Sequence, residues 1–339
     1  METLYTKYRP KNFDEVFGQK TIKNFFINSI DSKNLHHSFI FSGPRGTGKT
    51  TVARILAKSL NCKDRKDYNP CNKCSSCISI DRDSATDVIE IDAASNRGVE
   101  DIRDIQQKAY KRPMYGKYKV FIIDEVHSLT NYAFEALLKL IEEPPSYVVF
   151  IFATTQFVKI PDTVRSRCEK LFFKKLSDID LMNNLKRIVE IENINIENDS
   201  LSLIVKYSNG IARESVSNLN QLVSQFGKDI NSDLIVETFG LIDLEDKKRL
   251  ISSILSKDGK GVYNVLTKIE TKDVQIDVLI SEIVKSCYKI IYKIKDKNKM
   301  PMLWSLIKSI SSFETDIRYI SNPYPFLYAI IIEVMEKSC

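Results

Sequence analysis

Short apolar runs of strand length alternate with longer amphipathic stretches through the first half of the chain. The apolar runs, together with one alternating segment, predict strands at 39–41, 87–92, 118–124, 147–153 and 170–173. Apolar residues at helical spacing between these runs predict helices at 19–32, 49–60, 98–111 and 131–143. Strands that alternate with helices across residues 38–174 predict an α/β fold with a doubly wound parallel sheet.

From Ser177 onward the pattern becomes entirely helical. Helices are expected at 177–191, 199–208, 212–226, 274–295 and 324–336. The helix at 274–295 has one apolar face, formed by Ile276, Leu279, Ile283, Cys287, Ile290 and Ile294. The segment Tyr5 to Gly18 is expected to be a loop. We therefore expect an α/β domain at 1–175, a three-helix domain at 176–240 and a larger helical domain at 241–339.

Composition narrows the class of protein without fixing its function. Hydrophobic residues make up 43% of the 339 residues, which is ample for packed cores. The formal net charge of +6 permits contact with nucleic acid but does not require it. The lysine-rich run at 285–299 is expected to be a solvated helix face rather than a DNA-binding patch. We find no signal peptide and no apolar run long enough to span a membrane, so a cytoplasmic protein is expected.

The motif Gly43-Pro-Arg-Gly-Thr-Gly48-Lys49-Thr50 fits the phosphate-loop pattern G-x-x-x-x-G-K-[ST] between a predicted strand and a predicted helix. Its glycines let backbone N–H groups approach phosphate oxygens, and the helix N-terminus adds a positive dipole end. Lys49 can reach the outer phosphates, and the Thr50 hydroxyl can bind Mg²⁺. A plain glycine-rich turn is the alternative, which the Lys-Thr pair disfavours. The nucleotide-binding residues predicted here are Gly43, Pro44, Arg45, Gly46, Thr47, Gly48, Lys49, Thr50 and Thr51.

Two carboxylates, Asp124 and Glu125, stand at the end of the predicted strand 118–124. Ligands of open α/β sheets gather at the carboxyl ends of strands, so Asp124 is expected to hold Mg²⁺ through a water molecule, opposite Thr50. Glu125 is expected to orient the attacking water and take its proton. Together with the phosphate loop, this pair indicates a nucleoside triphosphatase.

Four cysteines lie within one short insertion at about 62–77, namely Cys62, Cys71, Cys74 and Cys77. Four thiolates on short loops suit a closed, structural Zn²⁺ site. A redox dithiol and an iron–sulfur centre are the alternatives, and zinc is favoured because no thioredoxin-like strand precedes the cluster. The adjacent pair His36-His37 is expected to serve packing or hydrogen bonding at a strand start rather than metal binding.

The chain resembles the AAA+ ATPase subunits of bacterial clamp loaders, the gamma/tau family of DNA polymerase III. The resemblance covers about the first half of the chain densely, and the four-cysteine insertion is its most specific part. The other matching stretches are Tyr8-Arg9-Pro10, Leu35-His36-His37, Gly43 to Thr50, Glu90 to Ser95, Asp124 to His127, Glu142 to Pro145, Ala153-Thr-Thr155 and Ser166-Arg167-Cys168.

This resemblance implies roles for further residues. Thr155 corresponds to the sensor-1 residue, which reads the γ-phosphate, and Arg167 to the arginine finger that reaches the ATP of a neighbouring subunit. Arg213 corresponds to sensor 2 on the lid, although its neighbours Ile211-Ala212 and Glu214 depart from the usual residues. Tyr8-Arg9-Pro10 corresponds to the segment that packs against adenine.

The resemblance also implies ATP, Mg²⁺ and Zn²⁺ as cofactors and a hetero-oligomer with a pentameric core. The implied partners are other gamma/tau copies, the delta and delta prime subunits, the sliding clamp and primer–template DNA. Residues 241–339 would form the collar that holds the pentamer together. The tail by which tau-type subunits hold the polymerase and the replicative helicase is absent, so a gamma-length product or a truncated chain is expected.

The function expected from these features is ATP-driven loading of the sliding clamp onto primed DNA. Two alternatives remain open at this stage. The first is another AAA+ DNA motor, such as a branch-migration helicase or a helicase loader. The second is a non-hydrolysing structural subunit of the clamp loader, which the intact Lys49, Thr50, Asp124 and Glu125 disfavour.

Overall fold

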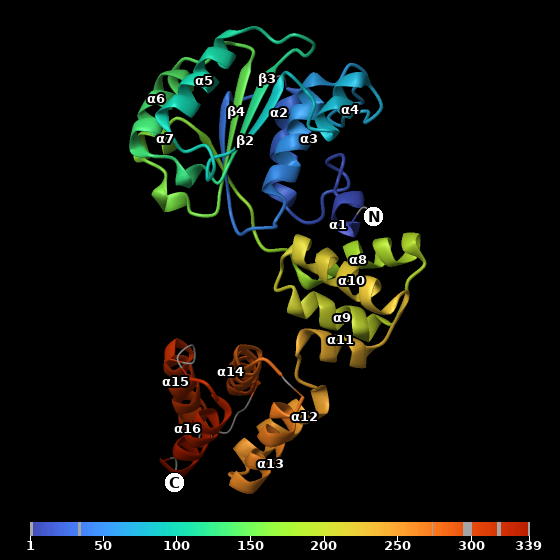
Figure 1. The fold of residues 1–339 in the computed structure, drawn as a ribbon, viewed down its shortest axis with the longest axis vertical. Helices are drawn as coiled ribbons and strands as arrows, with labels where there is room; N and C mark the ends of the chain where they lie inside the picture. Colours follow the sequence, from blue (N-terminus) through green and yellow to red (C-terminus); the bar gives the residue numbers. More distant parts are fainter. Residues whose placement is uncertain (1–2, 33–34, 273, 294–299, 317–319, 338–339) are drawn as a thin grey trace. The chain divides into compact units, whose positions relative to one another are not determined.

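The computed structural model describes residues 3–32, 35–272, 274–293, 300–316 and 320–337. The chain separates into two compact units, Met1–Asp229 and Ile230–Cys339 (Figure 1). The first contains the sheet with its helices, and the second contains helices. No helix among the described residues is long and apolar enough to cross a membrane.

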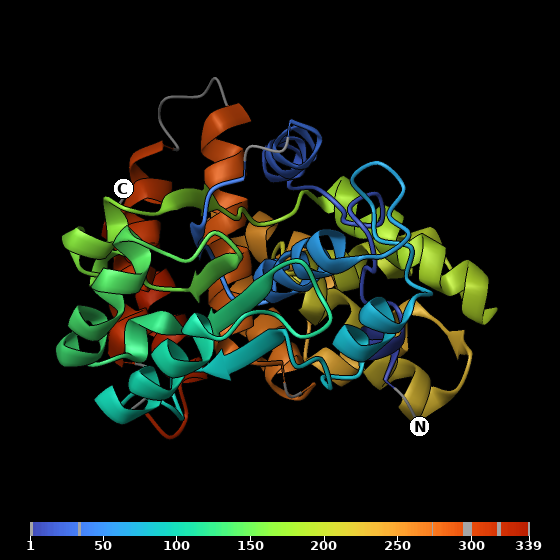
Figure 2. The ribbon, with the colours of Figure 1, turned by 90° about the horizontal axis from the view of Figure 1, so that it is seen from above.

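Five parallel strands form one sheet in the first unit, in the order β2-β3-β4-β1-β5. This arrangement confirms the predicted doubly wound parallel sheet, which is seen from above in Figure 2. The strands are β1 (Ser38–Ser42), β2 (Val88–Asp92), β3 (Lys119–Asp124), β4 (Val148–Thr154) and β5 (Glu169–Phe172). Each lies within a few residues of its predicted position.

Successive side chains of the central strands enter two separate apolar cores, one on each face of the sheet. In β1, Phe39 and Phe41 pack with Phe26 of α2, at ring-centroid distances of 5.5 and 5.7 Å, while Ile40 packs on the opposite face. Burial of one such phenylalanine is worth roughly 1.5–3 kcal/mol. A strand buried on both faces must be apolar throughout, which is why these strands read as continuous apolar runs. The covering helices are α2 (Lys20–Asp31) and α3 (Lys49–Asn61) on one face and α5 (Val99–Tyr110) and α6 (Asn131–Glu142) on the other.

The register aligns the carboxyl ends of the strands that carry the predicted chemistry. Ser42 at the end of β1 pairs with Thr154 of β4, and Asp92 of β2 pairs with Asp124 of β3. The loop after β1 and the residues after β3 and β4 therefore leave the sheet at the same edge.

The sequence did not predict several short elements of the first unit. The segment expected to be a loop begins with a one-turn helix, α1 (Leu4–Lys7), so that prediction was wrong there. A tertiary contact supports this turn, because the backbone N–H of Leu4 donates to Asn220 Oδ1 at 3.0 Å. The other unpredicted elements are α4 (Ser75–Asp81), η1 (Val126–Ser128), η2 (Phe157–Lys159) and α7 (Asp162–Arg165).

The helices predicted after Ser177 are present as α8 (Asp178–Glu192), α9 (Asn198–Tyr207) and α10 (Ala212–Phe226). The expectation of an entirely helical region was wrong in one detail. Two short strands, β6 (Asn195–Ile196) and β7 (Asp229–Ile230), form a second sheet.

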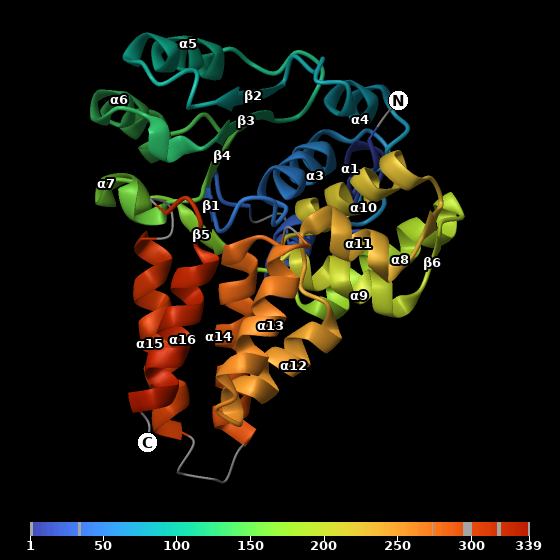
Figure 3. The same ribbon diagram turned by 60° about the horizontal axis from the view of Figure 1, so that its bottom comes forward.

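Five helices among the described residues of the second unit pack around one apolar core, namely α12 (Leu244–Leu255), α13 (Gly259–Glu270), α14 (Ile276–Lys293), α15 (Met300–Asp316) and α16 (Tyr324–Lys337). The described part of the unit also contains α11 (Ser232–Phe239), which contributes no residue to this core. The helices α15 and α16 pack side by side (Figure 3).

The predicted apolar face of α14 does face this core. Leu279, Ile283 and Cys287 are buried there, Ile276 and Ile290 pack against it, and Ile294 lies outside the described residues. In the lysine-rich run, Lys285 and Lys289 are exposed, as expected for a solvated face, and residues 294–299 of that run also lie outside the described residues.

Candidate functional site

The predicted phosphate loop joins β1 to α3. At two of its positions, Gly43 and Gly46, a side chain would collide with neighbouring atoms. A Cβ atom on Gly43, whose φ is +153°, would lie 2.3 Å from the carbonyl oxygen of Phe173. A Cβ atom on Gly46, at φ +75°, would lie 2.6 Å from Ile211 Cγ2. These contacts bring the loop against the chain that follows β5 and against the start of α10.

Lys49 is almost completely buried and folds back over the loop. Its Nζ donates to the carbonyl oxygens of Gly43 at 2.8 Å and Pro44 at 2.9 Å. Burial lowers the pKa of Lys49, while the nearby Glu125 and Asp124 oppose this change. A buried ammonium satisfied by carbonyl oxygens can exchange them for the stronger acceptors of a phosphate.

The hydroxyl of Thr50 donates to Asp124 Oδ2 at 2.8 Å. This contact joins the first turn of α3 to the end of β3, as the sequence predicts for the two residues assigned to Mg²⁺. A hydroxyl and a carboxylate oxygen at one point are the hard oxygen donors that Mg²⁺ prefers. The residues present therefore fit this ion.

Glu125 directly follows β3, and its carboxylate lies beside Thr155, which follows β4. Thr155 Oγ1 donates to Glu125 Oε2 at 3.2 Å, so the predicted base and the predicted sensor are in contact. His127, to which the sequence analysis gave no role, also lies near this oxygen, at 3.3 Å from its Nδ1.

A cavity of about 670 Å³ joins most of the predicted nucleotide-binding residues. It is large enough for a drug-sized ligand. Of the predicted residues, its lining includes Tyr8, Arg9, Pro10, Arg45, Gly46, Thr47, Gly48, Lys49, Thr50, Thr51, Asp124, Glu125 and Arg213. The lining does not include Gly43, Pro44, Thr155 or Arg167.

The N-terminal segment bridges the core and the helices after Ser177 across this cavity. On the core side, Arg9 Nε donates to Thr51 Oγ1 at 3.1 Å, and burial lowers the pKa of Arg9. On the other side, Lys7 Nζ and the Tyr8 hydroxyl both donate to Glu192 Oε1 at 2.6 Å. These two hydrogen bonds lower the pKa of Glu192.

Arg213 lies in the first turn of α10, at the edge of the cavity. Its backbone N–H donates to the carbonyl oxygen of Gly46 at 3.3 Å, and its guanidinium stacks 4.7 Å from the centre of the Tyr5 ring. The structure thus places Arg213 beside the phosphate loop, with its charge over an aromatic ring.

Arg54 is a cavity residue that the sequence analysis missed. It lies one helical turn after Thr50 and forms ion pairs with Glu90 at 2.6 Å and with Asp83 at 2.7 Å. Helical spacing from Thr50 could have placed Arg54 on the cavity side of α3, but no sequence signal indicated its two partners.

Arg167 lies outside the cavity, just after α7. Its Nε forms an ion pair with Glu142 Oε1 at 2.7 Å, and its Nη1 donates to the carbonyl oxygen of Thr163 at 2.8 Å. Its side chain remains 40% exposed. Arg167 is therefore presented on the surface, away from the cavity of its own chain.

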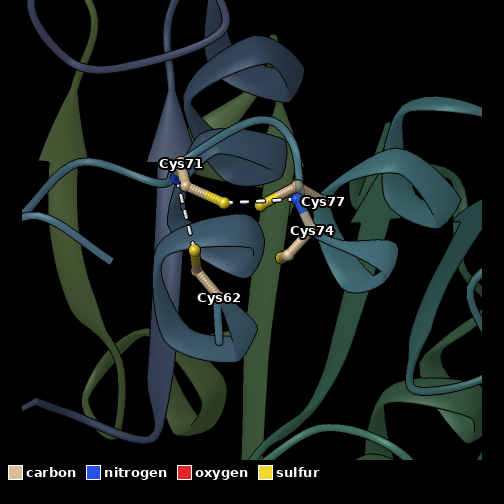
Figure 4. A group of neighbouring side chains, drawn as sticks. All are labelled: Cys62, Cys71, Cys74 and Cys77. Atoms are coloured by element: carbon tan, nitrogen blue, oxygen red, sulfur yellow. Dashed lines mark hydrogen bonds between the residues drawn. The ribbon is translucent and has the colours of Figure 1, made fainter. Parts of the chain in front are cut away.

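The four cysteines of the insertion converge on one point, as Figure 4 shows. Their Sγ atoms all lie within 4.8 Å of one another. Four thiolates at about 2.3 Å from a Zn²⁺ ion stand roughly 3.8 Å apart, so this donor set fits a tetrahedral zinc site. The N–H groups of Cys71 and Cys74 donate to Cys62 Sγ at 3.2 Å and to Cys71 Sγ at 3.3 Å.

The thiol groups of this cluster differ in acidity. Burial alone would raise the pKa of Cys74, but hydrogen bonds from the backbone of Cys77 and Lys63 lower it to about 6. Burial raises the pKa values of Cys62 and Cys77. A bound Zn²⁺ would hold all four groups as thiolates.

The histidine pair serves packing and hydrogen bonding, as predicted. The Nδ1 atom of His37 lies 2.9 Å from the carbonyl oxygen of Val148. His36 packs edge-on against Phe39, with ring centroids 6.5 Å apart.

The sequence is similar to several proteins of known family. The family model described as "DNA polymerase III, delta subunit" matches residues 18–177. DNA polymerase III subunit gamma/tau of Mycoplasma genitalium is 37% identical over 339 residues, which are 99% of this chain and 55% of the relative. DNA polymerase III subunit gamma of Buchnera aphidicola subsp. Baizongia pistaciae is 38% identical over 83% of this chain and 76% of the relative. The chain spans about half the length of the Mycoplasma relative.

Solved structures share the fold. The RuvB Holliday junction branch migration motor of Thermotoga maritima matches with a TM-score of 0.52 over 74% of this chain and 80% of that one. At 20% sequence identity this likeness concerns the fold alone.

Proposed function

Because the chain belongs to the DNA polymerase III gamma/tau family, we propose that it is an ATPase subunit of the bacterial clamp loader. In this role it binds and hydrolyses ATP to open the sliding clamp and load it onto primed DNA. The observation that carries the proposal is the 2.8 Å contact between Thr50 and Asp124 in the cavity that Lys49 and Glu125 also line.

Each residue at this edge of the sheet has a role in the proposed hydrolysis. Lys49 leaves its two carbonyl partners and binds the outer phosphates. Thr50 and Asp124 would hold Mg²⁺, which neutralises phosphate charge when bound. Glu125 orients a water molecule towards the γ-phosphorus and accepts its proton, and Thr155 fixes the Glu125 carboxylate.

The adenosine would lie between the N-terminal segment Tyr8-Arg9-Pro10 and the lid helices. Support comes from the position of this segment, which is tied to Thr51 on the core side and to Glu192 on α8. Arg213, at the start of α10, would leave Tyr5 to approach the phosphates as sensor 2. We propose residues 1–175 as the nucleotide-binding domain, 176–240 as the lid and 241–339 as the collar.

Arg167 would act on the nucleotide of a neighbouring subunit. Its position supports this role, because the guanidinium lies outside the cavity lining of its own chain and is 40% exposed, where a neighbouring subunit can reach it. Such an arginine stabilises charge on the transferring phosphoryl group. Its partners would be other gamma/tau copies, delta and delta prime around a pentameric core, with the clamp and primer–template DNA as substrates. The proposal places the protein in the cytoplasm, where bacterial DNA is replicated.

The test is reconstitution with candidate clamp-loader subunits, a sliding clamp and primed DNA. We expect clamp loading that depends on ATP hydrolysis by this chain. Clamp loading that proceeds unchanged with Glu125→Gln in every copy of the chain would support the structural-subunit alternative and overturn the ATPase assignment. Branch migration of a four-way junction without clamp loading would support the other motor, which the shared fold alone does not favour.

A further inference from the structure

His127 lies at the centre of a hydrogen-bonded group beside Glu125. It belongs to η1, the short helix directly after β3, and its side chain is only 12% exposed. Its Nδ1 lies 3.0 Å from Thr154 Oγ1 and 3.3 Å from Glu125 Oε2, and its Nε2 lies 3.2 Å from the Gln156 amide nitrogen. The ring therefore links the end of β3 to the end of β4.

The surroundings of the ring determine where its proton resides. Nδ1 faces two oxygens: the hydroxyl of Thr154, which can donate or accept, and the carboxylate of Glu125, which can only accept. Hydrogen on Nδ1 is the arrangement that suits both oxygens. With hydrogen on Nδ1, the neutral ring leaves Nε2 as an acceptor for the amide N–H of Gln156. In this tautomer the Nδ1–H has Thr154 Oγ1 at 3.0 Å and Glu125 Oε2 at 3.3 Å as acceptors, whereas the opposite tautomer sets a lone pair against the carboxylate.

The two oxygens of the Glu125 carboxylate differ in their surroundings. Oε2 accepts a hydrogen bond from Thr155 Oγ1 at 3.2 Å and lies 3.3 Å from His127 Nδ1. Oε1 receives no hydrogen bond from the part of the chain that the structure describes. The backbone of Glu125 has φ +47°, a left-handed conformation that non-glycine residues adopt rarely and that persists where its surroundings enforce it.

We propose that His127 is a positioning residue for ATP hydrolysis. Its Nδ1–H, which has Thr154 Oγ1 as its hydrogen-bond partner, also attracts Glu125 Oε2 at 3.3 Å. Together with the Thr155 hydroxyl it fixes the rotation of the carboxylate, so that Oε1 is the oxygen presented to water. Gln156 and Thr154 hold the ring in the tautomer and orientation that this contact requires. The inference rests on the proposed ATPase function and assigns His127 no contact with the nucleotide.

The test uses three substitutions of His127 in the reconstituted complex. The amide nitrogen of asparagine can take the place of Nδ1, whereas the amide nitrogen of glutamine reaches the place of Nε2. His127→Asn should therefore retain kcat within about 3-fold, and His127→Gln and His127→Ala should lose roughly 10- to 100-fold, as expected for a misplaced general base. Nucleotide Kd should stay within 2-fold of wild type in all three, because Lys49, Thr50 and the cavity are unchanged.

The comparison of Asn with Gln separates positioning from a merely structural role, because both variants replace the ring with an amide. Equal rates in the Asn and Gln variants, or an unchanged kcat in His127→Ala, would overturn the inference while wild-type hydrolysis upholds the proposed function. A loss confined to nucleotide affinity would overturn it as well. A wild-type complex that binds ATP but does not hydrolyse it would overturn the proposed function itself, and this inference with it.

Discussion

The charge of Lys49 is kept inside the molecule by two carbonyl oxygens of the loop that precedes it. Desolvation disfavours this ammonium, and nearby Asp124 and Glu125 favour it. Neither carboxylate is hydrogen-bonded to it, so the charge remains available to an incoming anion. A residue balanced in this way contributes to ligand binding more than to the stability of the fold.

Lys49→Ala should therefore weaken ATP binding by at least about 100-fold, or roughly 2.7 kcal/mol. The phosphates would lose their point charge, while the glycine loop would keep its backbone shape. Calorimetry with a non-hydrolysable ATP analogue measures the effect. Lys20→Ala, which removes an exposed lysine from α2, is the matched control and should bind as wild type does. An affinity for the analogue that survives in Lys49→Ala would contradict the predicted role.

Arg167→Ala should retain nucleotide binding and lose about 1000-fold of the turnover stimulated by assembly. Its guanidinium lies outside the cavity, so binding within one chain does not need it. The matched variant is Glu142→Gln, which weakens the ion pair of Arg167 but keeps the guanidinium. That variant should retain turnover. Full DNA-stimulated ATPase activity in the Arg167→Ala complex would show that the finger is a different residue.

At the scale of elements, helix α3 connects the phosphate loop to the cysteine insertion. Its first turn carries Thr50, and its third turn carries Lys58, whose side chain is 2% exposed. Lys58 Nζ donates at 2.9 Å both to Asn72, between two of the cysteines, and to Asp81, at the end of α4. One lysine thus ties the insertion to the helix that begins at the nucleotide cavity.

Lys58→Met should lower the free energy of unfolding by about 1–2 kcal/mol, because Asp81 and Asn72 lose a buried partner. The loss stays below that of a fully buried pair since Asp81 is 39% exposed and can be hydrated. Arg103→Met is the control: it breaks an exposed pair with Glu100 and should cost less than about 0.5 kcal/mol. Urea unfolding of the two variants measures the difference. Equal losses would mean that the buried tie adds no stability.

Cys74→Ser should abolish zinc binding by the insertion. Metal analysis of the purified wild-type protein is expected to give close to one zinc per chain, and none in the variant, because three thiolates and a hydroxyl do not close a structural site. Cys168→Ser is the control, since that buried thiol lies outside the cluster and should leave the zinc content unchanged. A metal-free wild-type protein that is fully folded would refute the zinc assignment.

The elements predicted correctly are those whose residues follow a clear pattern of apolar and polar positions over one strand or helix. The strands of the sheet were predictable because burial on both faces demands unbroken apolar runs, as in β3 and β4. The short helices α1 and α4 were not, since a single turn or two is held by tertiary contacts such as that of Leu4 with Asn220.

Within the candidate site, too, residues of local motifs were predictable, whereas contacts between distant segments were not. The phosphate-loop motif and the carboxylate at the end of β3 predict Thr50 and Asp124 as partners, and the structure places them in contact. The group around His127 could not be predicted, because it joins the ends of two strands whose distance depends on the order of strands in the sheet. The ion pairs of Arg54 with Asp83 and Glu90 were unpredictable for the same reason.

At the scale of the whole molecule, the cavity belongs to one unit of the chain. Every residue that lines it falls between Tyr5 and Val216, within the unit Met1–Asp229. The second unit has its own apolar core, formed by residues from Leu250 to Met335. Nucleotide binding and the proposed assembly through the collar should therefore be separable.

A fragment comprising residues 1–240, which ends at the left-handed Gly240 after α11, should bind ATP analogues within about 3-fold of the full chain. The same fragment should fail to form the complex with partner subunits, because the proposed collar is missing. Calorimetry and the mass of the mixture in solution measure the two properties, with the full chain as the control. If the fragment assembled as well as the full chain, residues 241–339 would not be the collar. If it folded but bound no nucleotide, the cavity would need a contribution from residues after Gly240.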